Sequence, residues 1–144
     1  MRNVLDVAPD KYLCKEPEYS CFNELCIIYC SSEAHYIHTN ALVYGGRWIG
    51  VLIRNKPYIS INIYEDVYRS GVFRASVVVS DMGCKAFLYG RDILKESIVS
   101  AHPPLNNPVA VIDNSDNRVI GVAEPYHDVY KNIYDLGLFI RIMK

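Results

Sequence analysis

Short apolar runs separated by turn-forming residues fill residues 71–144, and this pattern limits the fold more than any other feature of the sequence. VFRASVVVS is rich in β-branched residues, and VAVI and RVIGVAE flank the turn residues DNSDN, which predicts a hairpin. With CKAFLYG before them and LGLFIRIMK at the end, these runs predict about five or six short strands. The second half of the chain is therefore expected to be a small, mixed, barrel-like β module.

One helix is expected in this module, over residues 91–98. The apolar residues AFLY meet Gly90, and the helix-prone segment RDILKESI follows, with apolar residues recurring on one face. We interpret Gly90 as a helix-entry glycine that tolerates an unusual backbone angle. DMG is expected to turn the preceding strand back, and SAHPPLNNP and PYHDVYKNIYD are expected to be loops.

The middle of the chain predicts further strands. LCIIYC is a short apolar strand candidate, and RWIGVLIRNKPYISINIY predicts two strands around a turn at Asn55-Lys56-Pro57. In the second of these strands, apolar and polar residues alternate as far as Tyr64, which is the period of a sheet with one buried face. YEDVYRSG then predicts a helical turn that ends at Gly71.

We therefore predict an α+β chain in two domains. A small α/β domain is expected over residues 1–70, and the barrel-like β module over residues 71–144. Pro9 and Pro17 interrupt a polar, acidic N-terminal segment that has room only for short helical pieces. The fold of residues 1–44 stays open.

The composition predicts a packed protein without membrane association. About half of the 144 residues are hydrophobic, yet no apolar run approaches the ~20 residues of a membrane-spanning helix, and the N-terminus lacks a signal-peptide pattern. We expect a soluble cytoplasmic protein. The net charge of −1 gives no global support to nucleic-acid binding, but residues 34–74 carry five basic and two acidic residues. An anionic partner is expected to meet this central region first.

Five cysteines form an odd set without a secretory signal, which argues against a disulfide framework. Four of them, Cys14, Cys21, Cys26 and Cys30, lie close in sequence but form no C-x-x-C pair, the tight spacing that structural zinc sites usually contain. Buried apolar cysteines are the favoured interpretation. A metal site built on these cysteines is kept as a minority alternative.

No catalytic or cofactor-binding motif is recognised in the sequence. The four histidines are scattered, no nucleophile motif surrounds Cys84, and YGGRWIG is neither a P-loop nor a G-x-G-x-x-G segment. The sequence therefore predicts a protein that is not an enzyme and that uses no metal or cofactor.

The order of strand, FLYG, helix, VIGVA hairpin and closing strand resembles the PUA domain, an RNA-binding module named after pseudouridine synthases and archaeosine transglycosylases. FLYGRDILKESI looks like the Phe-Leu-Tyr-Gly segment of one family that carries this domain, and DLGLFIR is similar to that family's closing strand. GRWIGVLIRNKPYISINIYEDVY also resembles the segment before the PUA domain in that family. The family is that of the ribosome-biogenesis factors called nuclear import protein seven, with their archaeal relatives. The resemblance covers about residues 45–144.

This resemblance implies a two-domain, non-enzymatic protein that binds precursors of large-subunit ribosomal RNA, together with ribosome-assembly or RNA-processing proteins. Family members often carry a basic cluster before the last strand, where this chain has only Lys131 in AEPYHDVYKNIY. Cations would meet phosphates while aromatic rings stack on bases. The expected RNA-binding residues are Arg47, Trp48, Arg54, Lys56, Tyr89, Gly90, Arg91, Lys95, Lys131 and Arg141.

Two alternatives stay open at this point. The first is a protein-interaction adaptor with a PUA-shaped module, which the near-zero net charge favours. The second is a small metalloprotein that uses the N-terminal cysteines as ligands. Salt-dependent RNA binding would argue against the first, and the absence of stoichiometric metal would argue against the second.

Overall fold

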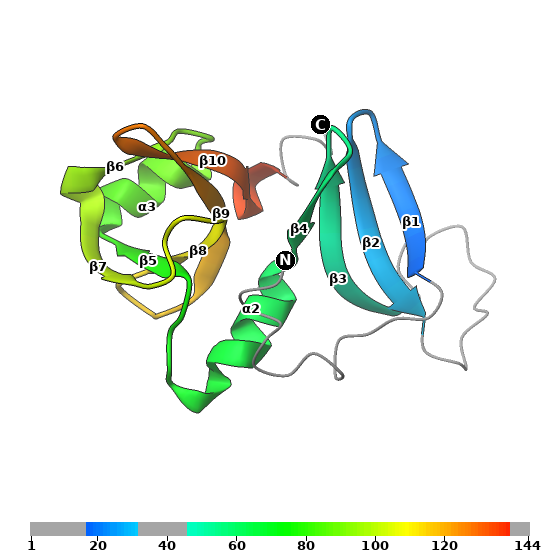
Figure 1. Cartoon of the computed structure of the whole chain (residues 1–144), viewed down its shortest axis with the longest axis horizontal. Helices are drawn as coiled ribbons and strands as arrows, with labels where there is room; N and C mark the ends of the chain where they lie inside the picture. The colour runs from blue at the N-terminus through cyan, green and yellow to red at the C-terminus, as the bar shows by residue number, and fades with distance from the viewer. Residues whose placement is uncertain (1–16, 32–45, 139–144) are drawn as a thin grey trace. The chain divides into compact units, whose positions relative to one another are not determined.

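The chain divides into two compact units. The computed structural model describes residues 17–31 and 46–138, and the units span residues 1–63 and 64–144 (Figure 1). The division lies within helix α2 (Ile61–Val67). The domain boundary expected near residue 70 stays a prediction.

The described part of the first unit is a four-stranded antiparallel sheet in which the strands follow chain order (Figure 1). Two-residue turns join the first two strands and the last two, and Asn23, Arg54 and Asn55 take positive φ angles of 57°, 50° and 66° in them. Such angles match the twist of short hairpins. The strands are β1 (Pro17–Phe22), β2 (Leu25–Ser31), β3 (Gly46–Ile53) and β4 (Lys56–Ile59).

The strand predicted from LCIIYC is confirmed as β2, and two neighbouring expectations are corrected. Residues 17–22 form a strand rather than a helical piece. The turn between β3 and β4 lies at Arg54-Asn55, before the predicted Asn55-Lys56-Pro57, because those two residues take the positive φ angles. Lys56 and Pro57 instead belong to β4.

The alternating strand expected through Tyr64 is wrong beyond Ile59. The Ser60 hydroxyl accepts a hydrogen bond from the Ile63 amide at 3.2 Å, and this contact caps the start of α2. Ile61, Tyr64 and Tyr68 are then buried at helical spacing, which outweighs their apparent period of two. The helix continues into a 3-10 turn, η2 (Tyr68–Ser70), which ends at Gly71 as predicted.

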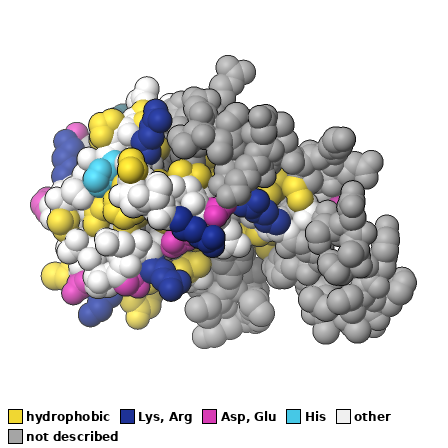
Figure 2. Space-filling view, turned by 90° about the horizontal axis from the view of Figure 1, so that it is seen from below, with side chains coloured by type: hydrophobic (Ala, Val, Ile, Leu, Met, Phe, Trp, Pro, Cys, Tyr) yellow, Lys and Arg dark blue, Asp and Glu magenta, His cyan; other side chains and the backbone are white. Residues whose placement is uncertain are grey.

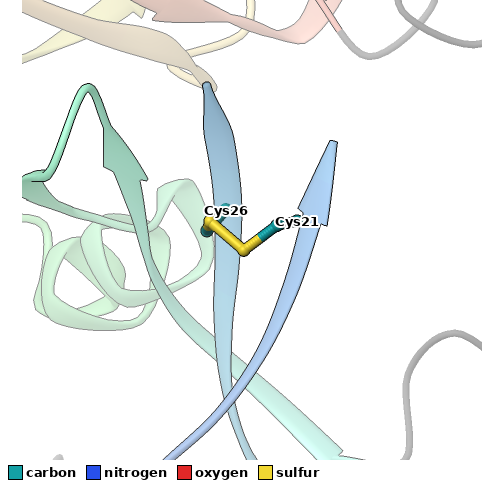
Figure 3. The surroundings of a disulfide bond; sticks show 2 residues. All are labelled: Cys21 and Cys26. Carbon is teal, nitrogen blue, oxygen red and sulfur yellow. A yellow bond between two sulfur atoms is a disulfide. The ribbon is translucent and has the colours of Figure 1, made fainter. Parts of the chain in front are cut away.

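A disulfide joins Cys21 and Cys26 across the β1–β2 hairpin (Figure 3). The two residues are direct partners in the strand register, one position beyond the pair Phe22 and Leu25 that flanks the turn, and their Cα atoms are 4.0 Å apart. The expectation of no disulfide is therefore wrong for this pair, because the tight turn brings the two side chains together. Within residues 17–31 and 46–138, no group of three or more metal-ligating side chains occurs.

The second unit contains a six-stranded mixed sheet that curls into a half-barrel, with few helices (Figure 1). The strand order is β6-β10-β9-β8-β5-β7; β5 and β8 run parallel, and the other pairs are antiparallel. The elements are β5 (Ser76–Val79), α3 (Asp81–Leu88), β6 (Ile93–Leu94), the 3-10 turn η3 (Lys95–Ser97), β7 (Ile98–His102), β8 (Val109–Asp113), β9 (Val119–Tyr126) and β10 (Val129–Asp135).

The hydrophobic core lies between α3 and the concave side of this sheet. Phe87 of α3 is fully buried and packs in one cluster with β-branched residues of β5, β6, β8 and β9. Gly121 of β9 allows this approach, because a Cβ atom there would lie 2.6 Å from Cε1 of Phe87 and would also collide with the carbonyl oxygen of Tyr134. At Gly121, β9 is therefore packed closely between Phe87 of α3 and the backbone of β10.

The helix predicted over residues 91–98 is wrong, because the helix precedes Gly90 rather than following it. α3 begins after Ser80, whose hydroxyl accepts a hydrogen bond from the Gly83 amide at 3.3 Å, so DMG is its first turn. Gly90 then ends it: its amide donates to the Phe87 oxygen at 2.9 Å, with φ +91°. The Arg91 amide donates to the Ala86 oxygen at 3.1 Å, which completes a Schellman cap.

The loop predicted over residues 125–135 is a β-hairpin. β9 continues to Tyr126, and β10 begins at Val129 after a two-residue turn in which His127 has a φ of 53°. The predicted VAVI/RVIGVAE hairpin is confirmed as β8 and β9. A helical turn occupies residues 136–138, where the closing strand was expected, and the rest of LGLFIRIMK lies outside the described residues.

The predicted loop SAHPPLNNP is partly strand, since β7 extends to His102. None of the helices in the described ranges has both the length and the apolar character that crossing a bilayer requires.

Candidate nucleic-acid interface

The end of α3 carries an exposed aromatic residue with one exposed cation before it and one after it in the chain. Tyr89 is 81% exposed, and Lys85, one helical turn before it, and Arg91, two residues after it, are also exposed. Neither Lys85 nor Arg91 forms an ion pair with a described residue. Both lie at the negative end of the helix dipole, where a cation is stabilised without a carboxylate partner. We call these three residues the α3-end cluster.

Asn132 of β10 holds the α3-end cluster in place. Its side-chain amide donates to the Phe87 oxygen at 2.9 Å, to the Arg91 oxygen at 3.3 Å and to Oδ2 of the buried Asp135 at 3.0 Å. Its backbone amide donates to Oδ1 of Asp92 at 2.9 Å. A bulge in β10 just after Asn132 accompanies these contacts. The cation-bearing segment after the helix is thus fixed by hydrogen bonds.

A second group of polar and aromatic side chains lies around the turn between β9 and β10. Tyr126 is 57% exposed; the Lys131 ammonium lies 5.7 Å from its ring centroid, and the His127 ring packs edge-on at 4.5 Å. Lys95 of η3 forms an ion pair with Asp128 at 3.7 Å. We call Lys95, Tyr126, His127, Asp128 and Lys131 the hairpin-tip cluster.

Carboxylates offset the cations of the hairpin-tip cluster. Lys131 lies directly opposite Glu124 in the β9–β10 register, and Lys95 is paired with Asp128. Residues 64–138 as a whole carry seven Lys or Arg and ten Asp or Glu residues. Figure 2 shows basic, acidic and hydrophobic side chains interspersed on the face turned to the viewer. Attraction of an anion by this unit therefore depends on local groups such as the α3-end cluster.

The site residues predicted in the first unit lie on β3, β4 and their turn. Arg54 is engaged with the neighbouring turn, because its Nε atom lies 3.0 Å from Oε2 of Glu24 and its amide donates to the Glu24 oxygen. The Lys56 ammonium lies 5.4 Å from the centroid of the Tyr58 ring. Arg54 and Lys56 are therefore already engaged in contacts within the first unit.

Trp48, the residue predicted to stack on bases, is half-buried, and its indole N–H donates to the Gly50 oxygen at 2.8 Å. Arg47 beside it is exposed. Arg141 lies outside the described residues. The structure thus brings Tyr89, Gly90 and Arg91 together and keeps Lys95 and Lys131 beside the hairpin. Arg47, Trp48, Arg54 and Lys56 lie on the first unit.

Sequence reasoning missed Lys85 and Tyr126. Lys85 is four residues before Tyr89, so a helix over residues 81–88 would have placed the two on one face. Tyr126 was assigned to a loop, and only the two-residue turn shows that it faces the same side of the sheet as Lys131. The helix predicted over residues 91–98 would have put Arg91 and Lys95 on one face, four residues apart, but neither lies in an α-helix.

Cys84, the free cysteine of the described ranges, is buried in the hydrophobic core cluster with Phe87. Its thiol donates to Oδ2 of Asp113 at 3.4 Å. Burial, together with the hydrogen bond and charge of Asp113, raises the pKa of the thiol to about 12. The Ser115 amide lowers the pKa of Asp113 by donating to its carboxylate. A thiol held protonated is a poor nucleophile and a poor metal ligand, so Cys84 packs rather than reacts.

Comparison with known proteins agrees with this architecture. Residues 75–144 match the UPF0113 PUA domain. The chain contains a PUA domain. Because PUA domains are RNA-binding modules, this match supports RNA binding in general terms. A search of curated proteins found no match.

Two solved structures resemble the chain in fold. One is a conserved PUA domain protein from Thermoplasma acidophilum, with a TM-score of 0.60 and 15% identity over 89% of this chain and 82% of that one. The other is a hypothetical protein from the archaeon Pyrococcus horikoshii, with a TM-score of 0.60 and 15% identity over 88% of this chain and 78% of that one. At this identity the likeness concerns the fold alone.

Proposed function

We propose that this protein binds RNA through the α3-end cluster of its PUA domain. The observation that carries this proposal is the exposed Tyr89 ring, with the exposed Lys85 and Arg91 before and after it in the chain, neither of which forms an ion pair with a described residue. A ring can stack on any base, while the two cations meet phosphates. Asn132 fixes the segment that carries Arg91, so less conformational entropy is lost on binding.

The test compares salt dependence as well as affinity. Fluorescence anisotropy with a labelled single-stranded ribosomal RNA fragment, and with duplex DNA as competitor, would be followed from ~50 to ~200 mM salt. Each phosphate contact adds about 0.7 to the slope of log affinity against log salt for a single strand. The Lys85→Ala/Arg91→Ala double variant is expected to reduce the slope by about 1.4.

Arg54→Ala is the matched control, because it removes an exposed cation already paired with Glu24. It is expected to leave both affinity and slope unchanged. If the double variant bound RNA with the wild-type slope, the α3-end cluster would not be the contact surface. Circular dichroism of both variants would confirm that they remain folded.

We further propose that the RNA is a precursor of large-subunit ribosomal RNA and that the protein is an accessory factor in ribosome assembly. The resemblance of FLYG and DLGLFIR to the nuclear import protein seven family supports this role. The role is one of binding rather than catalysis, and it is set in the cytoplasm. Crosslinking of the protein to RNA in cells, followed by sequencing, would be expected to recover ribosomal precursors; a spread over unrelated messenger RNAs would refute it.

A protein-interaction adaptor is the second candidate function, and the excess of acidic residues in residues 64–138 favours it. In that case the wild-type protein would fail to bind RNA even at ~50 mM salt, where phosphate contacts are strongest. The same anisotropy titration therefore decides between the two functions.

A further inference from the structure

The hairpin-tip cluster contains an aromatic ring whose surroundings differ from those of Tyr89. We propose that Tyr126 is a base-stacking subsite for single-stranded RNA, separate from the phosphate contacts at the α3-end cluster. This inference rests on the proposed function. It names the substrate as a single strand with accessible bases and gives the two clusters different roles.

The Tyr126 ring is presented for stacking. It is 57% exposed at the end of β9, and Lys131 and His127 contact it from within the hairpin, which limits its rotation. An ordered ring loses little entropy when it receives a base, and every base offers a π-face. A nearby ammonium also contacts the ring's electrons, a cation–π arrangement found where aromatic groups bind nucleic acid.

The charges around Tyr126 determine which part of the RNA meets it. Asp128 and Glu124 lie beside the two ammonium groups of Lys95 and Lys131, so a phosphate gains little by approaching. A neutral base avoids this cost. The strand is therefore expected to turn its bases toward the hairpin tip and its phosphates toward Lys85 and Arg91.

The two clusters are close enough for one short strand. Arg91 and Lys95 are four residues apart across β6, a span of at most about 14 Å for extended chain. β6 pairs with the first residues of β10, so the hairpin tip lies beside the same segment (Figure 1). A duplex would keep its bases stacked inside, and only unpaired bases could reach Tyr126.

The experiment measures binding of a fluorescein-labelled single-stranded RNA of mixed sequence, about 12 nucleotides long, which suits a small binding fold. Tyr126→Ala is expected to weaken binding about tenfold, the loss of one stacked base, while the salt slope stays at the wild-type value. Tyr126→Phe keeps the ring and is expected to bind like the wild type. Tyr126→Leu keeps apolar bulk without a π-face and is expected to resemble Tyr126→Ala.

Tyr19→Ala is the matched control, because Tyr19 is similarly exposed, at 55%, on β1 of the other unit. A second readout uses 2-aminopurine in the same RNA, whose fluorescence falls when it stacks. Quenching on binding is expected with the wild type and Tyr126→Phe, and is expected to be lost with Tyr126→Ala.

The outcomes separate the inference from the proposed function. If Tyr126→Ala binds like the wild type while Lys85→Ala/Arg91→Ala loses affinity, RNA is bound but Tyr126 is no subsite. If Tyr126→Leu binds like Tyr126→Phe, the contact is hydrophobic and the stacking proposal is overturned. If the wild-type protein binds no RNA, both the proposed function and this inference fail.

Discussion

The α3-end cluster and the hairpin-tip cluster carry the same kinds of side chain, a tyrosine and two cations, but their charges are arranged differently. At the α3 end, Lys85 and Arg91 lie at the negative end of the helix dipole, and no carboxylate within residues 17–31 and 46–138 forms an ion pair with them. At the hairpin tip Lys95 has Asp128, and Lys131 faces Glu124. Residue type alone therefore does not define a phosphate site; the availability of the positive charge does.

The largest expected effect comes from disturbing both clusters at once. Gly121→Ala would place a Cβ atom against Phe87 of α3 and the backbone of Tyr134 in β10. Because relieving the clash would require the backbone of β10 to shift, we expect the free energy of unfolding to fall by about 3 kcal/mol. Urea denaturation would measure this loss.

Gly71→Ala is the control for this substitution. Gly71 has a φ of +83° but open space around its Cβ position, so only backbone strain is added, about 1 kcal/mol. Equal losses for the two variants would show that neither Phe87 of α3 nor the β10 backbone is packed closely against Gly121.

The part of this arrangement that was predicted from the sequence is the set of strands with strong local signals. VAVI and RVIGVAE contain β-branched residues on both sides of a turn rich in Asn and Asp, and they form β8 and β9. β10 was missed because Lys131 and Asn132 interrupt its apolar pattern. The Asn132 side chain donates hydrogen bonds to the end of α3 and to the segment after it. These are tertiary contacts, so the local sequence pattern of β10 does not show them.

The direction of the helix could not be read from Gly90 alone. A glycine between two apolar segments fits the start of one helix as well as the end of another. The sequence does contain the deciding signal, since Ser80 and Asp81 are typical of a helix N-terminus. The error moved the expected RNA surface from the end of a helix to its start, and it hid Lys85.

Asn132→Ala is expected to have the second largest effect, and it should act on the α3-end cluster alone. The substitution removes hydrogen bonds to Phe87, Arg91 and Asp135, which predicts a loss of about 2 kcal/mol in the free energy of unfolding. Hydrogen exchange of the Arg91 amide should also become faster. Asn107→Ala, at an exposed position, is the control; a loss no larger than its own would contradict the role of Asn132.

Cys84 gives a prediction about pH, because its buried thiol donates a hydrogen bond to Asp113. In the unfolded chain the thiol ionises near its ordinary pKa of 9.0, and in the native state near about 12. Between these values the native state binds more protons, so stability falls as the pH rises from about 9 to about 12.

Buried tyrosines with raised pKa values contribute to the same fall, so the measurement is the difference between the wild type and Cys84→Ala. The variant is expected to lose stability less steeply across this interval in urea titrations. Identical slopes would mean that the Cys84 thiol is not held in its protonated form. At neutral pH, iodoacetamide should modify native Cys84 slowly.

The smallest expected effect is also the sharpest test of the difference between the clusters. Lys95→Ala removes an exposed ion pair with Asp128, and such pairs contribute at most about 1 kcal/mol, so the melting temperature should barely change.

The RNA affinity of Lys95→Ala is expected to stay within about twofold of the wild type, because the lost ammonium was already offset by a carboxylate. Arg91→Ala, which removes a cation that forms no ion pair with the described residues, should weaken binding several-fold and reduce the salt slope by about 0.7. If Lys95→Ala weakened RNA binding as much as Arg91→Ala, charge pairing would not distinguish the two surfaces. The phosphate path would then have to include the hairpin tip.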